Sequence, residues 1–183
     1  MPEWIIDPDH SVASFCVRHM MIADVHGQFN GVRGVVRFDP ATPAHLSVEA
    51  EIDVAGIYTG IGKRDEHLRS PDFFDAPRYP AITFTGKRTD GGGGRECAVT
   101  GELTIRGVTR TVTLEGEYTG PLADPFDEGA MSVGFTGTTV INREDYGVIW
   151  NATWDGGIMV GREVRITLNV EADRGRGESG PWV

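Results

Sequence analysis

An alternation of apolar and polar residues over residues 46–55 limits the fold of this chain more than any other feature. One set of alternate positions holds Leu46, Val48, Ala50, Ile52 and Val54, and the other holds Ser47, Glu49, Glu51 and Asp53. Because successive side chains of a strand point to opposite faces, this pattern predicts a strand with one buried face. A helix would mix the two sets around its surface.

The same alternation recurs in seven further stretches, so the sequence predicts eight strands. These stretches are 13–17, 32–38, 82–84, 97–105, 112–118, 131–135 and 164–170. The loops "TDGGGGRE" and "RGVTR" between them are typical of hairpins. Because parallel neighbours need crossovers of about a dozen residues or more, such short connections favour antiparallel pairing. The chain is therefore predicted to be all-β.

Strands this long favour an extended eight-stranded antiparallel barrel over two packed sheets. Small residues also occur at positions expected to face the interior: Ala13, Gly34, Ala50, Gly101, Gly116 and Gly137. They have two interpretations, which the sequence leaves open. They either make room for a ligand, or they are glycines that allow the strands to bend.

Length and charge exclude several classes of protein. The 183 residues suit one domain, expected over residues 1–173, followed by a flexible tail at 174–183 rich in Gly and charge. A net charge of -10 argues against nucleic acid as a partner. No run of 18 apolar residues and no signal peptide is recognisable, so we expect no stable membrane insertion and a cytoplasmic location. Cys16 and Cys97 form no disulfide framework.

Two connections, residues 58–79 and 142–161, are long enough for short helices. In "SPDFFDAPRYPAITF", we expect one helical turn with Ser70 as its N-cap and Pro71 in the first helical position. Phe73 and Phe74 are too hydrophobic for a solvated loop. They are expected to turn toward the barrel, either as a lid over a ligand or as a plug that completes the core.

Four long blocks resemble one known family. They are "IDPDHSVASFCVRHMMIADVHGQF", "RDEHLRSPDFFDAPRYPAITF", "VTGELTIRGVTRTVTLEGEY" and "GFTGTTVINREDYGVIWN". Together they resemble the YceI family of lipocalin-like, polyisoprenoid-binding proteins over roughly residues 4–172. The resemblance implies a long apolar cavity, a bound polyprenyl or quinone-like lipid, homodimerisation as an option, and no catalysis.

The alternation in the strands and the family resemblance together predict a protein that binds, carries or sequesters a long polyisoprenoid such as a polyprenyl diphosphate. Alternatives are an isoprenoid quinone, a fatty amide, or a structural barrel with a filled core. The expected apolar lining is Phe15, Val17, Phe38, Val48, Ala50, Ile52, Phe73, Phe74, Phe84, Leu103, Leu114, Phe135 and Trp150.

A polar head group needs cations or hydrogen-bond donors near one end of the barrel. The candidates are His19, His67, Arg143 and Asn142, of which Asn142, like Asn151, would suit a quinone carbonyl. Lys63, Arg64 and Arg69 are further cations before the lid. Each of these side chains also has a purely structural interpretation, as a surface charge or a turn cap.

The sequence contains little that indicates an enzyme. The five histidines are scattered without the close pairs of a zinc site, and "DPDH" at 7–10 is better explained as a turn than as a metal site. "GIGKR" at 60–64 lacks the spacing of a phosphate-binding loop, and no GxSxG motif occurs. We therefore expect no catalytic residues, no metal and no cofactor.

Overall fold

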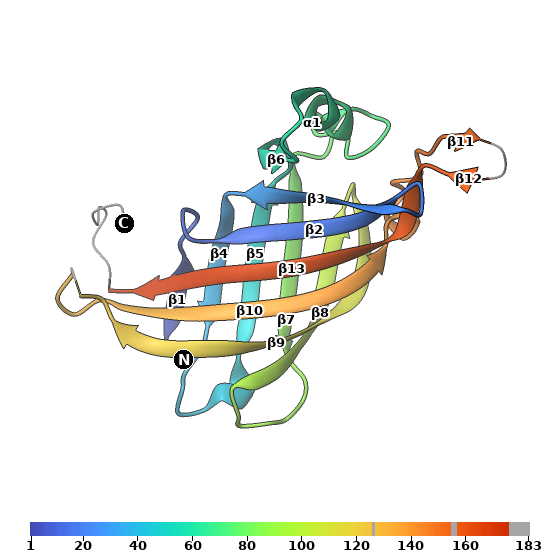
Figure 1. Cartoon of the computed structure of the whole chain (residues 1–183). Helices are drawn as coiled ribbons and strands as arrows, with labels where there is room; N and C mark the ends of the chain where they lie inside the picture. Colours follow the sequence, from blue (N-terminus) through green and yellow to red (C-terminus); the bar gives the residue numbers. More distant parts are fainter. Residues whose placement is uncertain (126, 155–156, 176–183) are drawn as a thin grey trace.

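The computed structural model describes residues 1–125, 127–154 and 157–175. Strands dominate them, with one α-helix and three 3₁₀ turns (Figure 1). In chain order the elements are β1 (Glu3–Ile6), β2 (Val12–His19), β3 (Ala23–Asn30), β4 (Val32–Arg37), η1 (Pro43–His45), β5 (Ser47–Asp53), η2 (Val54–Gly56), β6 (Ile57–Tyr58), α1 (Gly62–Arg69), β7 (Ala81–Arg88), β8 (Glu96–Ile105), β9 (Val108–Ala123), β10 (Met131–Asn142), η3 (Arg143–Tyr146), β11 (Thr153–Trp154), β12 (Gly157–Ile158) and β13 (Val160–Arg174).

Eight strands form a closed antiparallel circuit. Its order is β1-β4-β5-β7-β8-β9-β10-β13, and β13 returns to β1 through the pairs Ile5–Asp173 and Ile6–Ala172. Closure pairs the two ends of this circuit, β1 and β13, with each other. The predicted eight-stranded antiparallel barrel is confirmed.

The strands β2, β3 and β6 continue the sheet beyond the circuit. The 15-residue β13 pairs with β1 near its C-terminal end and with β2 along the rest of its length. Figure 1 shows β2, β3, β10 and β13 crossing in front of β4, β5 and β7, with α1 above β6. The wall therefore extends on one side toward the segment that contains the helix.

Five strands are absent from the predicted set: β1, β3 and the two-residue strands β6, β11 and β12. In β3 the inward position opposite Phe15 is Gly27, which interrupts the apolar alternation. The Phe15 ring lies over this glycine, so that a Cβ at Gly27 would overlap it. The apolar group at this position comes from the neighbouring strand, which the β3 sequence alone does not reveal. β1 has only four residues, too few for a clear pattern.

The inward glycines mainly allow neighbouring backbones to approach closely. A Cβ on Gly116 would overlap the carbonyl oxygen of Thr136 on β10, and a Cβ on Gly101 would overlap the carbonyl oxygen of Thr85 on β7. Gly137, the register partner of Gly116, has more room, with the Leu114 Cβ at 3.6 Å as the nearest atom. The close approach of neighbouring backbones therefore explains Gly101 and Gly116, whereas a Cβ at Gly137 would fit at an ordinary contact distance.

Aromatic side chains close one end of the barrel. The Trp4 indole N–H donates to the carbonyl of Phe38 at 2.8 Å, and neither side chain is more than 1% exposed. The Phe38 ring packs 4.7 Å from Tyr118 and 5.6 Å from Phe135, measured between centroids. Edge-to-face contacts of this kind favour a rigid arrangement. We call Trp4, Phe38 and Tyr118 the aromatic plug.

The connection between β6 and β7 contains a helix, α1, which ends at Ser70, where the Ser70 hydroxyl donates to the carbonyl of His67 at 2.7 Å. The predicted turn follows at 71–74, and the Ser70 Oγ accepts from the N–H of Asp72 at 3.4 Å, so Ser70 lies at the end of α1 and at the start of this turn. Phe73 and Phe74 follow in a turn and pack against the core, which confirms their predicted burial. We call residues 70–79 the lid.

In the second long connection, between β10 and β13, the described residues form the short 3₁₀ helix η3, as expected, and the paired strands β11 and β12. Residues 176–183, most of the predicted tail, lie outside the described residues, and β13 continues to Arg174. Both cysteines are free thiols, and Cys97 is buried.

Candidate ligand-binding cavity

The barrel encloses a cavity of about 240 Å³ whose wall is almost wholly apolar. It extends from the lid, at Phe73 and Phe74, to Phe135 above the aromatic plug. Its volume lies slightly below the ~300–1,000 Å³ typical of small-molecule sites. The wall is apolar because alternate residues of each strand face inward, and these are mostly the apolar ones.

All the predicted apolar lining residues except Phe38 and Trp150 line the cavity. Phe38 belongs to the plug below it. Trp150 packs outside it, 5.2 Å from the Phe73 ring and 4.9 Å from His67. The residues on the wall are Phe15, Val17, Val48, Ala50, Ile52, Phe73, Phe74, Phe84, Leu103, Leu114 and Phe135.

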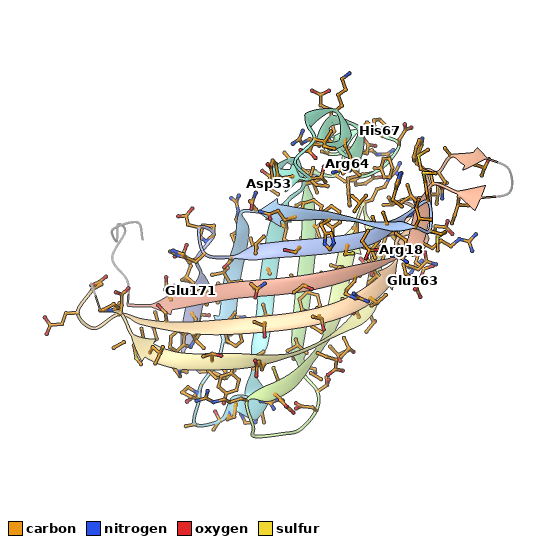
Figure 2. All side chains as sticks on the ribbon, in the orientation of Figure 1. Arg18, Asp53, Arg64, His67, Glu163 and Glu171 are labelled. Atoms are coloured by element: carbon orange, nitrogen blue, oxygen red, sulfur yellow. The ribbon has the colours of Figure 1, made fainter. Side chains whose placement is uncertain are left out.

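The two predicted head-group histidines lie away from the cavity wall. His67 is on α1, above the strands (Figure 2), and its Nε2 pairs with the Asp72 carboxylate at 2.8 Å. Its ring also packs edge-on against Phe73 and Trp150. His19 is the last residue of β2, in register with Val160. Both positions suit structural roles at the rim.

The predicted asparagines cap turns. The side-chain oxygen of Asn142 accepts from the backbone N–H of Glu144 at 3.0 Å, at the start of η3. Asn151 donates to the carbonyl of Val160 at 2.8 Å and accepts from the N–H of Met159 at 3.0 Å. These bonds shape the connection between β10 and β13.

Arg143 lines the cavity but directs its donors at the backbone. Its guanidinium donates to the carbonyls of Gly161, Val148, Trp150 and Val160 at 2.6–3.2 Å. The side chain is buried, and burial lowers its pKa from the usual value. Across the residues that the structure describes, no carboxylate lies within ion-pair distance of it. Arg143 therefore fixes the loop that closes this end of the barrel.

A second arginine joins the lid to that loop. Arg106, in the β8–β9 turn, donates to the carbonyls of Phe73 at 2.7 Å, Gly147 at 3.0 Å and Pro71 at 2.9 Å. Sequence reasoning missed this role, because a hairpin arginine is ordinarily a surface charge. One side chain thus ties the lid to the loop that contains Gly147.

Sequence reasoning also missed Tyr146, the last residue of η3. It lines the cavity, is 2% exposed, and has a buried hydroxyl without a hydrogen-bond partner among the described residues. Burial raises the pKa of this hydroxyl. Because Tyr146 lies in a loop, the alternation of residues along a strand does not show that it faces the interior.

Two groups of metal-ligating side chains lie elsewhere. On the outer face of β2 and β3, the Cys16 sulfur lies 4.0 Å from His26 Nε2, with Asp24 nearby, but Asp24 also pairs with Arg18 at 3.0 Å. The second group is Asp7, His10 and Glu171. Its Asp7 carboxylate accepts from the N–H of Asp9 at 2.9 Å, as in the predicted turn. Histidines scattered in sequence therefore do come close to other ligands in the fold.

None of the helices among the described residues has the length and apolarity needed to cross a bilayer.

A closed eight-stranded barrel around an apolar space belongs to the class of small β-barrels that can hold one small ligand. A model of the YceI-like domain matches residues 4–172. The chain belongs to the YceI family, and the resemblance seen in the sequence is confirmed.

Relatives cover nearly the whole chain. A UPF0312 protein of Staphylococcus aureus (strain MSSA476) is 34% identical over 172 residues, 93% of this chain and 97% of that protein. Burkholderia cenocepacia BcnA superposes with a TM-score of 0.77 at 30% identity, covering 91% of this chain and 99% of BcnA. A polyisoprenoid binding domain from Saccharophagus degradans shares the fold, with a TM-score of 0.66 at 14% identity and coverage of 92% and 97%.

Proposed function

We propose that this protein binds and carries a long apolar isoprenoid inside the barrel. The observation that carries the proposal is the cavity of about 240 Å³ with an apolar wall. Among the described residues, no histidine and no carboxylate lines it, which favours binding over acid–base catalysis. The space also argues against a barrel whose core is filled by its own side chains.

The size of the cavity limits how the lipid is held. Burying about ten chain carbons at ~0.8 kcal/mol each contributes ~8 kcal/mol, enough for micromolar affinity before other costs. A chain of tens of carbons exceeds the enclosed space, so its remainder needs the lid to move or to let the chain pass. Phe73 and Phe74, which line the cavity, would then contact the ligand at the exit.

The name of the Saccharophagus degradans domain supports an isoprenoid ligand over a fatty amide. That domain is described as polyisoprenoid binding, although at 14% identity the likeness itself concerns the fold. The test is uptake of a polyprenol by the delipidated protein, followed by native mass spectrometry. One polyprenol per barrel is expected, whereas a chain that takes up none would contradict the proposal.

Filling the cavity is expected to block uptake. In Gly137→Phe, the new side chain would enter the cavity from the inner face of β10, where a Cβ makes only ordinary contact, 3.6 Å from the Leu114 Cβ. We expect polyprenol affinity to fall at least tenfold, because the ring occupies volume that the chain needs. Titration with a fluorescent polyprenol analogue measures this loss.

Val140→Phe is the matched control for this substitution. Val140 is on the same strand but is 55% exposed and does not line the cavity. It should leave uptake unchanged, and thermal unfolding should show that both variants remain folded. Equal affinities for the Gly137→Phe variant and the original chain would remove β10 from the binding wall.

A further inference from the structure

The Tyr146 hydroxyl is an anomaly in an otherwise well-paired structure. Buried polar side chains nearly always have a partner, so each exception needs an explanation. Among the described residues, this hydroxyl is the one buried side-chain oxygen or nitrogen that lacks a hydrogen bond. The side chain is 2% exposed, so bulk water does not supply the missing partner.

The position of Tyr146 suggests where the partner comes from. Tyr146 follows Arg143 in the turn η3, and both line the cavity near the lid. The cavity wall is almost wholly apolar, and its few hydroxyl-bearing residues, Ser14, Thr83, Thr136 and Thr139, form no hydrogen bond with the Tyr146 hydroxyl. A molecule that fills the cavity is therefore the available source of one.

The protonation state of Tyr146 defines what it can recognise. Loss of water around the phenol raises its pKa above the usual value, so at neutral pH the group is a neutral O–H donor. A neutral donor pairs well with a carbonyl or hydroxyl oxygen. A diphosphate would require cations as well.

The hydrogen-bond donors of Arg143 are already used within the protein. Its Nε and both terminal nitrogens already donate to carbonyl oxygens of the loop. No second arginine and no lysine lines the cavity in the described part of the chain. A diphosphate placed at Tyr146 would meet the positive charges of Arg143 and Arg110 but would compete with four loop carbonyls for the Arg143 donors, whereas an uncharged oxygen needs only the phenol.

We propose that the Tyr146 hydroxyl donates a hydrogen bond to an uncharged oxygen of the ligand, so that the cavity selects isoprenoids bearing a carbonyl or hydroxyl group. This inference rests on the proposed function, and narrows the ligand class to quinone-like or alcohol-ended isoprenoids. It disfavours a plain hydrocarbon, which leaves the hydroxyl unpaired, and it favours an uncharged oxygen over a diphosphate, because the nitrogens of Arg143 already donate to loop carbonyls.

The test compares Tyr146→Phe with the original chain against two probes, an isoprenoid quinone and the hydrocarbon squalene. The substitution removes only the hydroxyl, so we expect about tenfold weaker binding of the quinone and no loss for squalene. Tyr58→Phe is the control. Tyr58 is 57% exposed and lies outside the cavity, so this variant should bind both probes as the original chain does.

A second readout needs no ligand. Because the hydroxyl of the empty barrel has no protein partner, Tyr146→Phe should keep or raise the midpoint of thermal unfolding. A lowered midpoint would show that the hydroxyl bonds within the protein and would overturn the inference.

The binding outcomes separate the two proposals. If the original chain binds both probes and Tyr146→Phe leaves their affinity ratio unchanged, the inference fails while the carrier function stands. If the original chain binds neither probe nor a polyprenol, the carrier function itself fails, and the inference falls with it.

Discussion

Replacing Gly116 by alanine is expected to destabilise the barrel by about 3 kcal/mol or more, the upper range for overpacking. The new methyl group would overlap the carbonyl oxygen of Thr136, an atom of the neighbouring backbone that cannot rotate away. Strands β9 and β10 would have to separate where Gly116 faces Gly137. Equilibrium unfolding in urea, monitored by circular dichroism, measures the change.

The facing glycine provides the control. Gly137→Ala places its methyl group in ordinary contact, since the nearest atom is 3.6 Å away. Its effect should stay within about 1 kcal/mol, as for other substitutions that neither clash nor create a cavity. Similar losses for the two variants would show that the close approach at Gly116 does not limit which residues the barrel accepts.

Arg143→Met is expected to cost about 3–5 kcal/mol, as when one member of a buried polar network is removed. The substitution leaves the carbonyls of Gly161, Val148, Trp150 and Val160 without the guanidinium that now satisfies them. Because this loop closes the barrel near the lid, faster amide exchange is expected across it. Chemical denaturation and hydrogen exchange test the two effects.

Arg162→Met is the matched control for this variant. Arg162 is exposed and pairs with Glu144 at 3.2 Å on the surface, so removing it should cost less than about 1 kcal/mol. Arg143→Lys should fall between the two, since an ammonium group cannot reach all four carbonyls in the same plane. A loss for Arg143→Met no larger than for Arg162→Met would contradict the proposed role of Arg143 in closing the loop.

The barrel could be predicted from the sequence because the alternation of apolar and polar residues is visible within each strand. The alternation from Leu46 to Val54 and its repeats set which residues face inward, and closure follows from long antiparallel strands. The same alternation predicted most of the residues that line the apolar wall, including Phe84 and Leu114. The burial of Phe73 and Phe74 could be predicted from their hydrophobicity alone.

What the sequence did not predict depends on contacts between distant segments. Ser70 was predicted only as the start of a turn, yet its hydrogen bond to His67 also makes it the C-cap of α1. Gly101 faces inward as predicted, yet it serves the close approach of β7 instead of leaving room for a ligand. The roles of Arg143 and Tyr146 follow from a loop without period-two alternation.

The most direct test of the enclosed-ligand account is a crystal structure of the protein loaded with a polyprenol. We expect continuous density for the chain inside the barrel, from the lid at Phe73 to Phe135, with the aromatic plug unchanged. Density for the lipid on the outer face alone, around a barrel interior that stays empty or collapses, would contradict it.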